Sequence, residues 1–154
     1  MSKKIFLFFL AFALINSLYI TFRFYQKRHF SCSSQYYTSQ KNISMKAIFR
    51  LVFNGSDGVA TLTGDVKDEQ GRHLALNRQI NFTFKERNSI YFMQSVKTLR
   101  ESYDEVDNET FRQLISAFFY EDRATIQYKI IPQPNGDFVV FNGVLPLAYC
   151  SRTS

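Results

Sequence analysis

The feature that most constrains this chain is an uninterrupted apolar run near its N-terminus. Residues 5–22 read IFLFFLAFALINSLYITF, eighteen residues without a charge. As an α-helix at about 1.5 Å per residue, this run is roughly 27 Å long, close to the roughly 30 Å hydrocarbon core of a bilayer. Lys3 and Lys4 precede the run, and three basic residues follow it before residue 29. We therefore predict a single transmembrane helix.

A cleaved signal peptide is the alternative interpretation of this run. The apolar core of a signal peptide is typically about 7–15 residues long and ends at a small-residue cleavage site. Here the run is longer, and no Ala-x-Ala pattern follows it. Cys32 is a poor lipoprotein acceptor, because residues 29–31 (His-Phe-Ser) lack the small side chains that such a site requires. We expect an uncleaved membrane anchor.

The two cysteines bear on the orientation of that anchor, because basic residues flank both of its ends and the positive-inside rule barely discriminates. Cys32 and Cys150 lie 118 positions apart, at the two ends of the polar part of the chain. A disulfide between them would tie the start of the domain to its last strand and would persist only in an oxidising compartment. Two unpaired thiols are the alternative. We expect the disulfide, a short cytoplasmic N-terminus and a domain on the other side of the membrane.

The formal net charge of +6 belongs to the N-terminal segment. Residues 1–30 carry five basic side chains and no acidic one, whereas residues 31–154 carry 14 basic and 13 acidic side chains. A protein that binds nucleic acid directly needs its basic surface on the folded domain. We expect no direct nucleic-acid binding.

Apolar residues alternate with polar ones through most of the remaining chain, which is the pattern of half-buried strands. The alternation begins at Ile43 and continues in segments separated by turn sequences such as Asn54–Gly58 and Glu69–Gly71. The predicted organisation is a cytoplasmic tail (1–4), a transmembrane helix (5–22), a juxtamembrane tether (23–42), a β domain (43–150) and a C-terminal tail (151–154).

One segment departs from this period of two. Phe111, Leu114, Ile115 and Phe118 have the spacing of an amphipathic helix, and Asp107 is a suitable N-cap residue. Six strands, a last extended piece over residues 145–150 and one helix describe an antiparallel meander. Because one face of this sheet is rich in large apolar side chains, it must curl or be covered by the helix. The predicted fold class is mostly β, with a minor α component, as a partial barrel after the transmembrane helix.

Residues for catalysis or metal binding are scarce. The only histidines are His29, beside the apolar run, and His73, on the polar face of a predicted strand. A metal site needs three or four clustered ligands, and no spacing supplies them. The acidic group between Glu101 and Glu109 resembles paired catalytic carboxylates, but a solvated loop and helix cap explain it better. We expect neither an enzyme nor a cofactor.

Arg78 is unusual because it lies on the apolar face of its predicted strand. A buried guanidinium needs a partner or a route to solvent. A structural ion pair with a carboxylate of the domain is one interpretation, and a cation facing an anionic ligand or a partner's acid is the other. The neighbouring apolar stripe is either core or pocket lining. The candidate ligand or partner face comprises Phe49, Leu51, Leu76, Arg78, Ile80, Phe82 and Phe84.

Several short motifs lie in the same order as in a known family. They are the basic start and single span, Cys32, the Phe53–Gly58 hairpin with Thr63-Gly64-Asp65, the Asn77-Arg78-Gln79-Ile80 strand and the Pro146–Cys150 ending. This layout resembles the FidL-like family of small enterobacterial inner-membrane proteins over essentially the whole chain. None of the motifs is catalytic.

The resemblance implies similarity to ToxS-type periplasmic partners of membrane-bound transcriptional regulators with a winged-helix domain. It implies a bacterial inner-membrane location, with the N-terminus cytoplasmic and a lipocalin-like periplasmic domain. The expected function is to bind and stabilise or modulate such a regulator, with a shared cavity for a small amphipathic ligand such as a bile salt. A self-contained, membrane-tethered binding protein for small hydrophobic ligands is the alternative.

Overall fold

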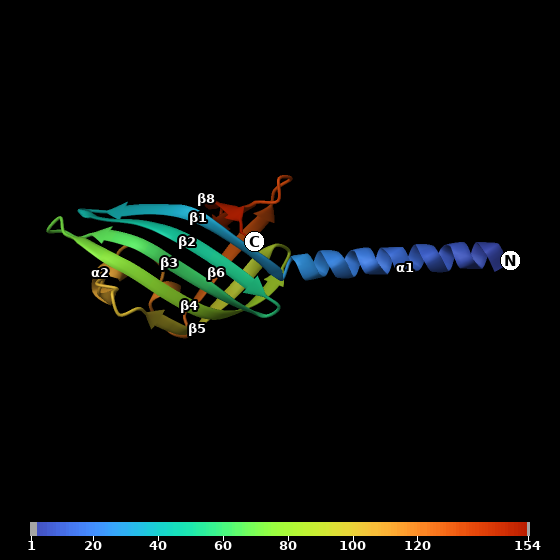
Figure 1. Cartoon of the computed structure of the whole chain (residues 1–154), viewed down its shortest axis with the longest axis horizontal. Helices are drawn as coiled ribbons and strands as arrows, with labels where there is room; N and C mark the ends of the chain where they lie inside the picture. The colour runs from blue at the N-terminus through green and yellow to red at the C-terminus, as the bar shows by residue number, and fades with distance from the viewer. Residues whose placement is uncertain (1–2, 154) are drawn as a thin grey trace.

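A long helix continues into an eight-stranded barrel (Figure 1). The computed structural model describes residues 3–153, without the side chain of Lys4; residues 1–2 and 154, which belong to the two predicted tails, lie outside the described residues. Helix α1 spans Lys3–Gln26, and its segment Ile5–Gln26 is long and apolar enough to cross a membrane. None of that segment is buried against the rest of the protein.

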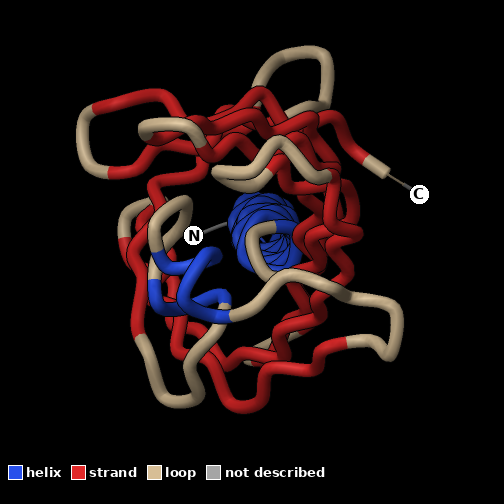
Figure 2. Tube along the Cα trace, turned by 90° about the vertical axis from the view of Figure 1, so that its left-hand side faces the viewer, coloured by secondary structure: helices blue, strands red, loops and turns tan. Residues whose placement is uncertain are grey.

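The remaining chain is an antiparallel meander in which every strand pairs with the next. The strands are β1 (His29–Gln40), β2 (Ile43–Asn54), β3 (Asp57–Lys67), β4 (His73–Arg87), β5 (Ile90–Arg100), β6 (Thr125–Pro132), β7 (Phe138–Asn142) and β8 (Leu145–Arg152). Figure 2 looks along α1, which projects inside the ring of strands. The barrel therefore lies at the C-terminal end of α1, with the helix running on from one of its open ends.

The predicted fold class is confirmed: the domain is mostly β and antiparallel, and an apolar helix precedes it. The structure differs from the expectation of a partial barrel, because β1 and β8 pair and close the ring. Residues 23–42 were expected to be a juxtamembrane tether, but the structure places 23–26 in α1 and 29–40 in β1. This strand supplies the edge to which the C-terminal strand returns.

The predicted amphipathic helix is shorter than its apolar pattern. Only α2 (Asn108–Arg112) is α-helical, followed by a single 3-10 turn, η1 (Ala117–Phe119). Asp107 caps α2, as predicted, because its carboxylate accepts a hydrogen bond from the backbone N–H of Thr110 at 2.8 Å. The apolar side chains of this segment still point inward, and Phe111 and Phe118 are fully buried. The segment packs into the end of the barrel that lies away from α1 (Figure 1).

Aromatic side chains fill the barrel toward the end that joins α1. Phe53 contacts the rings of Phe30, Phe82, Phe84 and Tyr91, with centroid separations between 4.6 and 5.4 Å. Such edge-to-face and stacked pairs are favourable beyond the area that they bury. The inward positions therefore form a packed core.

Candidate functional site

All residues of the predicted ligand or partner face lie inside this core. Their exposed fractions are between 0 and 6%, and they contact other core side chains. As a set these side chains are packing positions of the core, and they present little surface to a ligand from outside. The site must be sought elsewhere on the domain.

Arg78 is held by the loop between β5 and α2. Its side chain is 1% exposed, and its Nε lies 3.1 Å from a carboxylate oxygen of Asp104, whose side chain is fully buried. Its terminal nitrogens donate to the side chain of Asn108 and to the backbone carbonyl of Val106. The guanidinium also stacks over Phe111, 4.1 Å from the ring centroid. Burial lowers the pKa of Arg78, while the hydrogen bond and charge of Asp104 act in the opposite direction.

This network fixes the loop that plugs the outer end of the barrel. Asp104 also accepts hydrogen bonds from the backbone N–H groups of Asn77 and Val106, at 3.0 Å each, and lies 3.2 Å from Nε of Arg100. Each nitrogen of the Arg78 guanidinium and both carboxylate oxygens of Asp104 thus have a partner within the chain. The arrangement has the features of a structural ion pair.

The strand pairing is weakest between β1 and β8, a region that we call the seam. Only Cys32↔Arg152 and Ser33↔Ser151 are paired, although β1 continues to Gln40 and β8 begins at Leu145. Among the described residues, no backbone hydrogen bond joins residues 34–40 to residues 145–150. Two strand edges therefore face an opening in the wall of the barrel.

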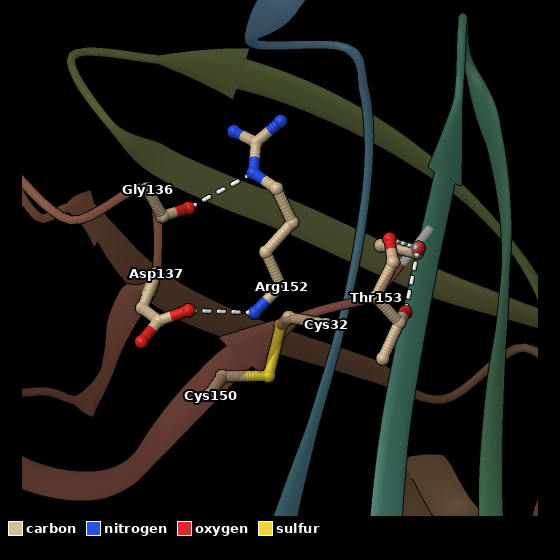
Figure 3. Close-up of a disulfide and its surroundings, with 7 residues drawn as sticks. Cys32, Gly136, Asp137, Cys150, Arg152 and Thr153 are labelled. Carbon is tan, nitrogen blue, oxygen red and sulfur yellow. Dashed lines mark hydrogen bonds between the residues drawn. A yellow bond between two sulfur atoms is a disulfide. The ribbon is translucent and has the colours of Figure 1, made fainter.

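A disulfide closes one end of the seam, as Figure 3 shows. Cys32 and Cys150 are bonded, with their Cα atoms 5.3 Å apart, and both are fully buried. The predicted disulfide is confirmed. Beside it, the backbone N–H of Arg152 donates to Asp137 at 2.9 Å, and the N–H of Thr153 donates to the carbonyl of Ser31 at 3.0 Å.

Large apolar side chains are exposed along the open part of the seam. Tyr37 on β1 is 68% exposed, Leu145 at the start of β8 is 70% exposed, and Tyr149 is half exposed. Between the strands lies a pocket of only about 20 Å³, to which Tyr36 and Leu147 contribute. The seam therefore combines a few exposed apolar side chains with the polar side chains of β1 and with strand edges that are not paired to each other, and it encloses only this small pocket.

Nothing in the described part of the chain forms a metal centre, since no group of three or more His, Cys, Asp or Glu side chains is placed to hold an ion. His73 lies on the surface beside Asp65, with 3.1 Å between Nδ1 and the carboxylate. In the acidic group of the sequence, Asp104 belongs to the buried pair and Asp107 caps α2. Both carboxylates therefore stabilise the local fold.

Sequence reasoning missed the seam as a surface. Residues 31–42 are polar, so the strand within them carried little hydrophobic signal. The aromatic and β-branched residues Tyr36, Tyr37 and Thr38 were the available sign of a strand. Which strand edges would meet depends on closure of the whole barrel.

These features define a class: a small, disulfide-closed, eight-stranded β-barrel carried on one apolar helix. The chain belongs to the YqeJ C-terminal domain family, whose model matches residues 27–150. The match begins immediately after α1 and covers the barrel up to the second cysteine. No curated protein and no solved structure matches the chain. The family assignment does not itself extend to the FidL-like or ToxS-type proteins of the motif comparison.

Proposed function

We propose that the protein is a single-span inner-membrane accessory protein whose periplasmic barrel binds a partner protein along the seam. The partner is a membrane-bound winged-helix transcriptional regulator, as the FidL-like motifs imply. Binding stabilises or modulates the regulator by adding a strand, or an apolar face, of its periplasmic domain to the free edges of β1 and β8. Signals would reach the cytoplasm through the winged-helix domain of the partner.

The observation that carries this proposal is the incomplete pairing at the seam. Exposed strand edges are templates for an added strand, and main-chain hydrogen bonds then provide affinity. The pairing of β5 with β6 is short as well, but there the chain covers its own edge. Ser95 exchanges backbone hydrogen bonds with Arg123 and Ala124, and Thr98 donates its N–H to Asp122. Residues 34–40 have no equivalent cover among the described residues.

The packed interior argues against the alternative of a self-contained carrier of hydrophobic ligands. Binding sites for small molecules typically enclose about 300–1,000 Å³. The pocket between the core and the seam has about 20 Å³. The interior of the closed barrel therefore has no room for a bile-salt-sized ligand, which would need a surface cleft or a cavity formed together with the partner.

Co-purification tests the proposal. The full chain and a regulator encoded beside its gene are co-expressed, solubilised and isolated through a tag on the regulator. We expect Tyr37→Arg and Leu145→Arg to reduce recovery at least tenfold, because each places a charge in an apolar interface. The matched control is Val96→Arg, since Val96 is 56% exposed but lies on β5, away from the seam.

Either of two outcomes would overturn the proposal. One is a complex that both seam variants leave intact. The other is a purified chain that ignores the regulator but shows a higher melting temperature with bile salts, which would favour the carrier instead.

A further inference from the structure

A second surface lies where α1 meets the barrel. It is a pocket of about 260 Å³ with a floor of apolar and aromatic side chains and a rim of cations. The rim is formed by Arg23 in the last turn of α1, Lys27 just after it, and Arg152 at the end of β8. The lining includes no carboxylate. We call this surface the basic mouth.

The cations of the basic mouth have spare hydrogen-bonding capacity. Nε of Arg152 donates to the carbonyl of Gly136 at 2.9 Å, while the two terminal nitrogens of its guanidinium find no acceptor among residues 3–153. Figure 3 shows this guanidinium directed away from the disulfide and toward the chain that enters β1. Two nearby carboxylates are engaged: Glu86 lies 3.4 Å from Nζ of Lys27, and Asp137 binds the backbone of Arg152.

Hydrogen bonds and ring stacking at the junction between α1 and the barrel hold the cations of the basic mouth in place. The hydroxyl of Tyr91 donates to the carbonyl of Lys27 at 2.7 Å, and Gly55 donates its N–H to the carbonyl of Arg28 at 2.9 Å. The rings of Tyr25 and His29 stack with centroids 3.8 Å apart. The basic mouth is therefore a preformed surface at a fixed position relative to α1.

We propose that the basic mouth binds the phosphate headgroup of an anionic phospholipid. The proposal rests on the membrane-spanning role of α1 in the proposed function. The uncharged run of the helix ends at Phe22, so Arg23 and Lys27 lie at the level where the hydrocarbon gives way to headgroups. Arg23 and Arg152 form no ion pair within residues 3–153, and Lys27, although paired with Glu86, adds a third positive charge. Guanidinium groups form strong charge-assisted hydrogen bonds with a phosphate.

The floor of the pocket fits the part of a lipid that follows the phosphate. Phe30, Tyr91, Ile130 and Phe138 line it, next to the hydroxyl-bearing Ser89. A volume of about 260 Å³ holds a headgroup and the adjoining glycerol but not the acyl chains. Those chains would remain in the bilayer beside the fully exposed apolar surface of α1.

Lipid binding by the full chain in detergent micelles tests this proposal. Native mass spectrometry and thermal unfolding compare added phosphatidylglycerol with phosphatidylcholine. We expect phosphatidylglycerol to bind roughly tenfold more tightly and to raise the melting temperature. Arg23→Gln with Arg152→Gln should remove this preference, whereas Arg112→Gln, at the opposite end of the barrel, should leave it unchanged.

The single variant Arg23→Gln is a control for misfolding, because the Arg23 side chain makes no hydrogen bond within the described residues. We expect this variant to weaken phosphatidylglycerol binding severalfold. Equal binding of the two lipids, or unchanged binding in both variants, would overturn the proposal. So would competition by free glycerol 3-phosphate at the same concentration, which would indicate a soluble ligand. Variants that lose lipid binding but still capture the regulator would show that the two proposals are independent.

Discussion

At the scale of single residues, Arg78 shows how a charge on an apolar strand face can organise the chain around it. Its requirement for a partner could be predicted from the sequence, because an isolated buried guanidinium is costly. The identity of that partner could not. Asp104 lies 26 positions away in an irregular loop, and several other acidic residues surround it in sequence.

The buried pair yields a stability prediction. Asp104→Asn leaves Arg78 buried without its counter-ion, so we expect the free energy of unfolding to fall by about 3–5 kcal/mol. Chemical denaturation of the full chain in detergent measures this change. Asp65→Asn is the control: it removes the exposed contact with His73 and should change stability by less than about 1 kcal/mol. Equal effects of the two substitutions would contradict the structural role of the pair.

The N-cap of α2 yields a pH-dependent prediction. Hydrogen bonds from the backbone and side chain of Thr110 lower the pKa of Asp107 below its ordinary value of 3.8. The cap therefore stabilises the fold above that value and is lost as the pH falls through the lowered pKa. Asp107→Ala should cost about 1 kcal/mol at pH 7 and progressively less below pH 4. Thermal melts across this range test it, and a difference independent of pH would refute it.

At the scale of elements, the strands from residue 43 to the C-terminal segment could be predicted, whereas β1 could not. The strands between residues 43 and 100 alternate clearly, and their turns contain glycine and asparagine. The inward series of β1 includes the polar residues Ser34 and Thr38 beside Phe30 and Tyr36, so its hydrophobic alternation is interrupted. The apolar spacing around Phe111 correctly predicted burial but overestimated helix length, because the same side chains also reach the core from a turn.

The stability of the seam depends on the disulfide between Cys32 and Cys150. Replacing Cys32 and Cys150 by alanine should lower the free energy of unfolding by about 2–5 kcal/mol, because only two residue pairs otherwise join β1 to β8. Denaturant unfolding with and without a thiol reductant measures the effect. The reductant should reproduce the loss in the natural chain and leave the double variant unchanged. Insensitivity of the natural chain would mean that the strands hold the seam without the bond.

At the scale of the whole molecule, α1 and the barrel are distinct in chemistry and in sequence. The family match covers the barrel and not the apolar helix, and the helix has no buried apolar segment. The helix is long and apolar enough to span a membrane, whereas the barrel core is complete without it. The apolar run alone predicts this division of the chain into a helix and a domain. It does not predict that the strands of the domain close into a barrel.

Fractionation of cells tests the proposed topology. We expect the full chain to remain with the membranes after an alkaline carbonate wash, and a C-terminal tag to be digested by protease added to spheroplasts. Deletion of residues 3–26 behind a cleavable export signal should release the barrel in soluble form. A tag that stays protected in intact spheroplasts would place the domain in the cytoplasm and contradict the proposal.

The hydrogen-bonded junction between α1 and the barrel has a consequence for how partners meet. In the proposed topology, a barrel carried end-on by α1 keeps its seam facing sideways, at one height above the bilayer. A partner anchored in the same bilayer would then approach by diffusion in two dimensions. Its periplasmic domain would meet the seam at a constant height. Shared anchoring raises the effective concentration of the two domains, so a modest strip of strand edge suffices for lasting association.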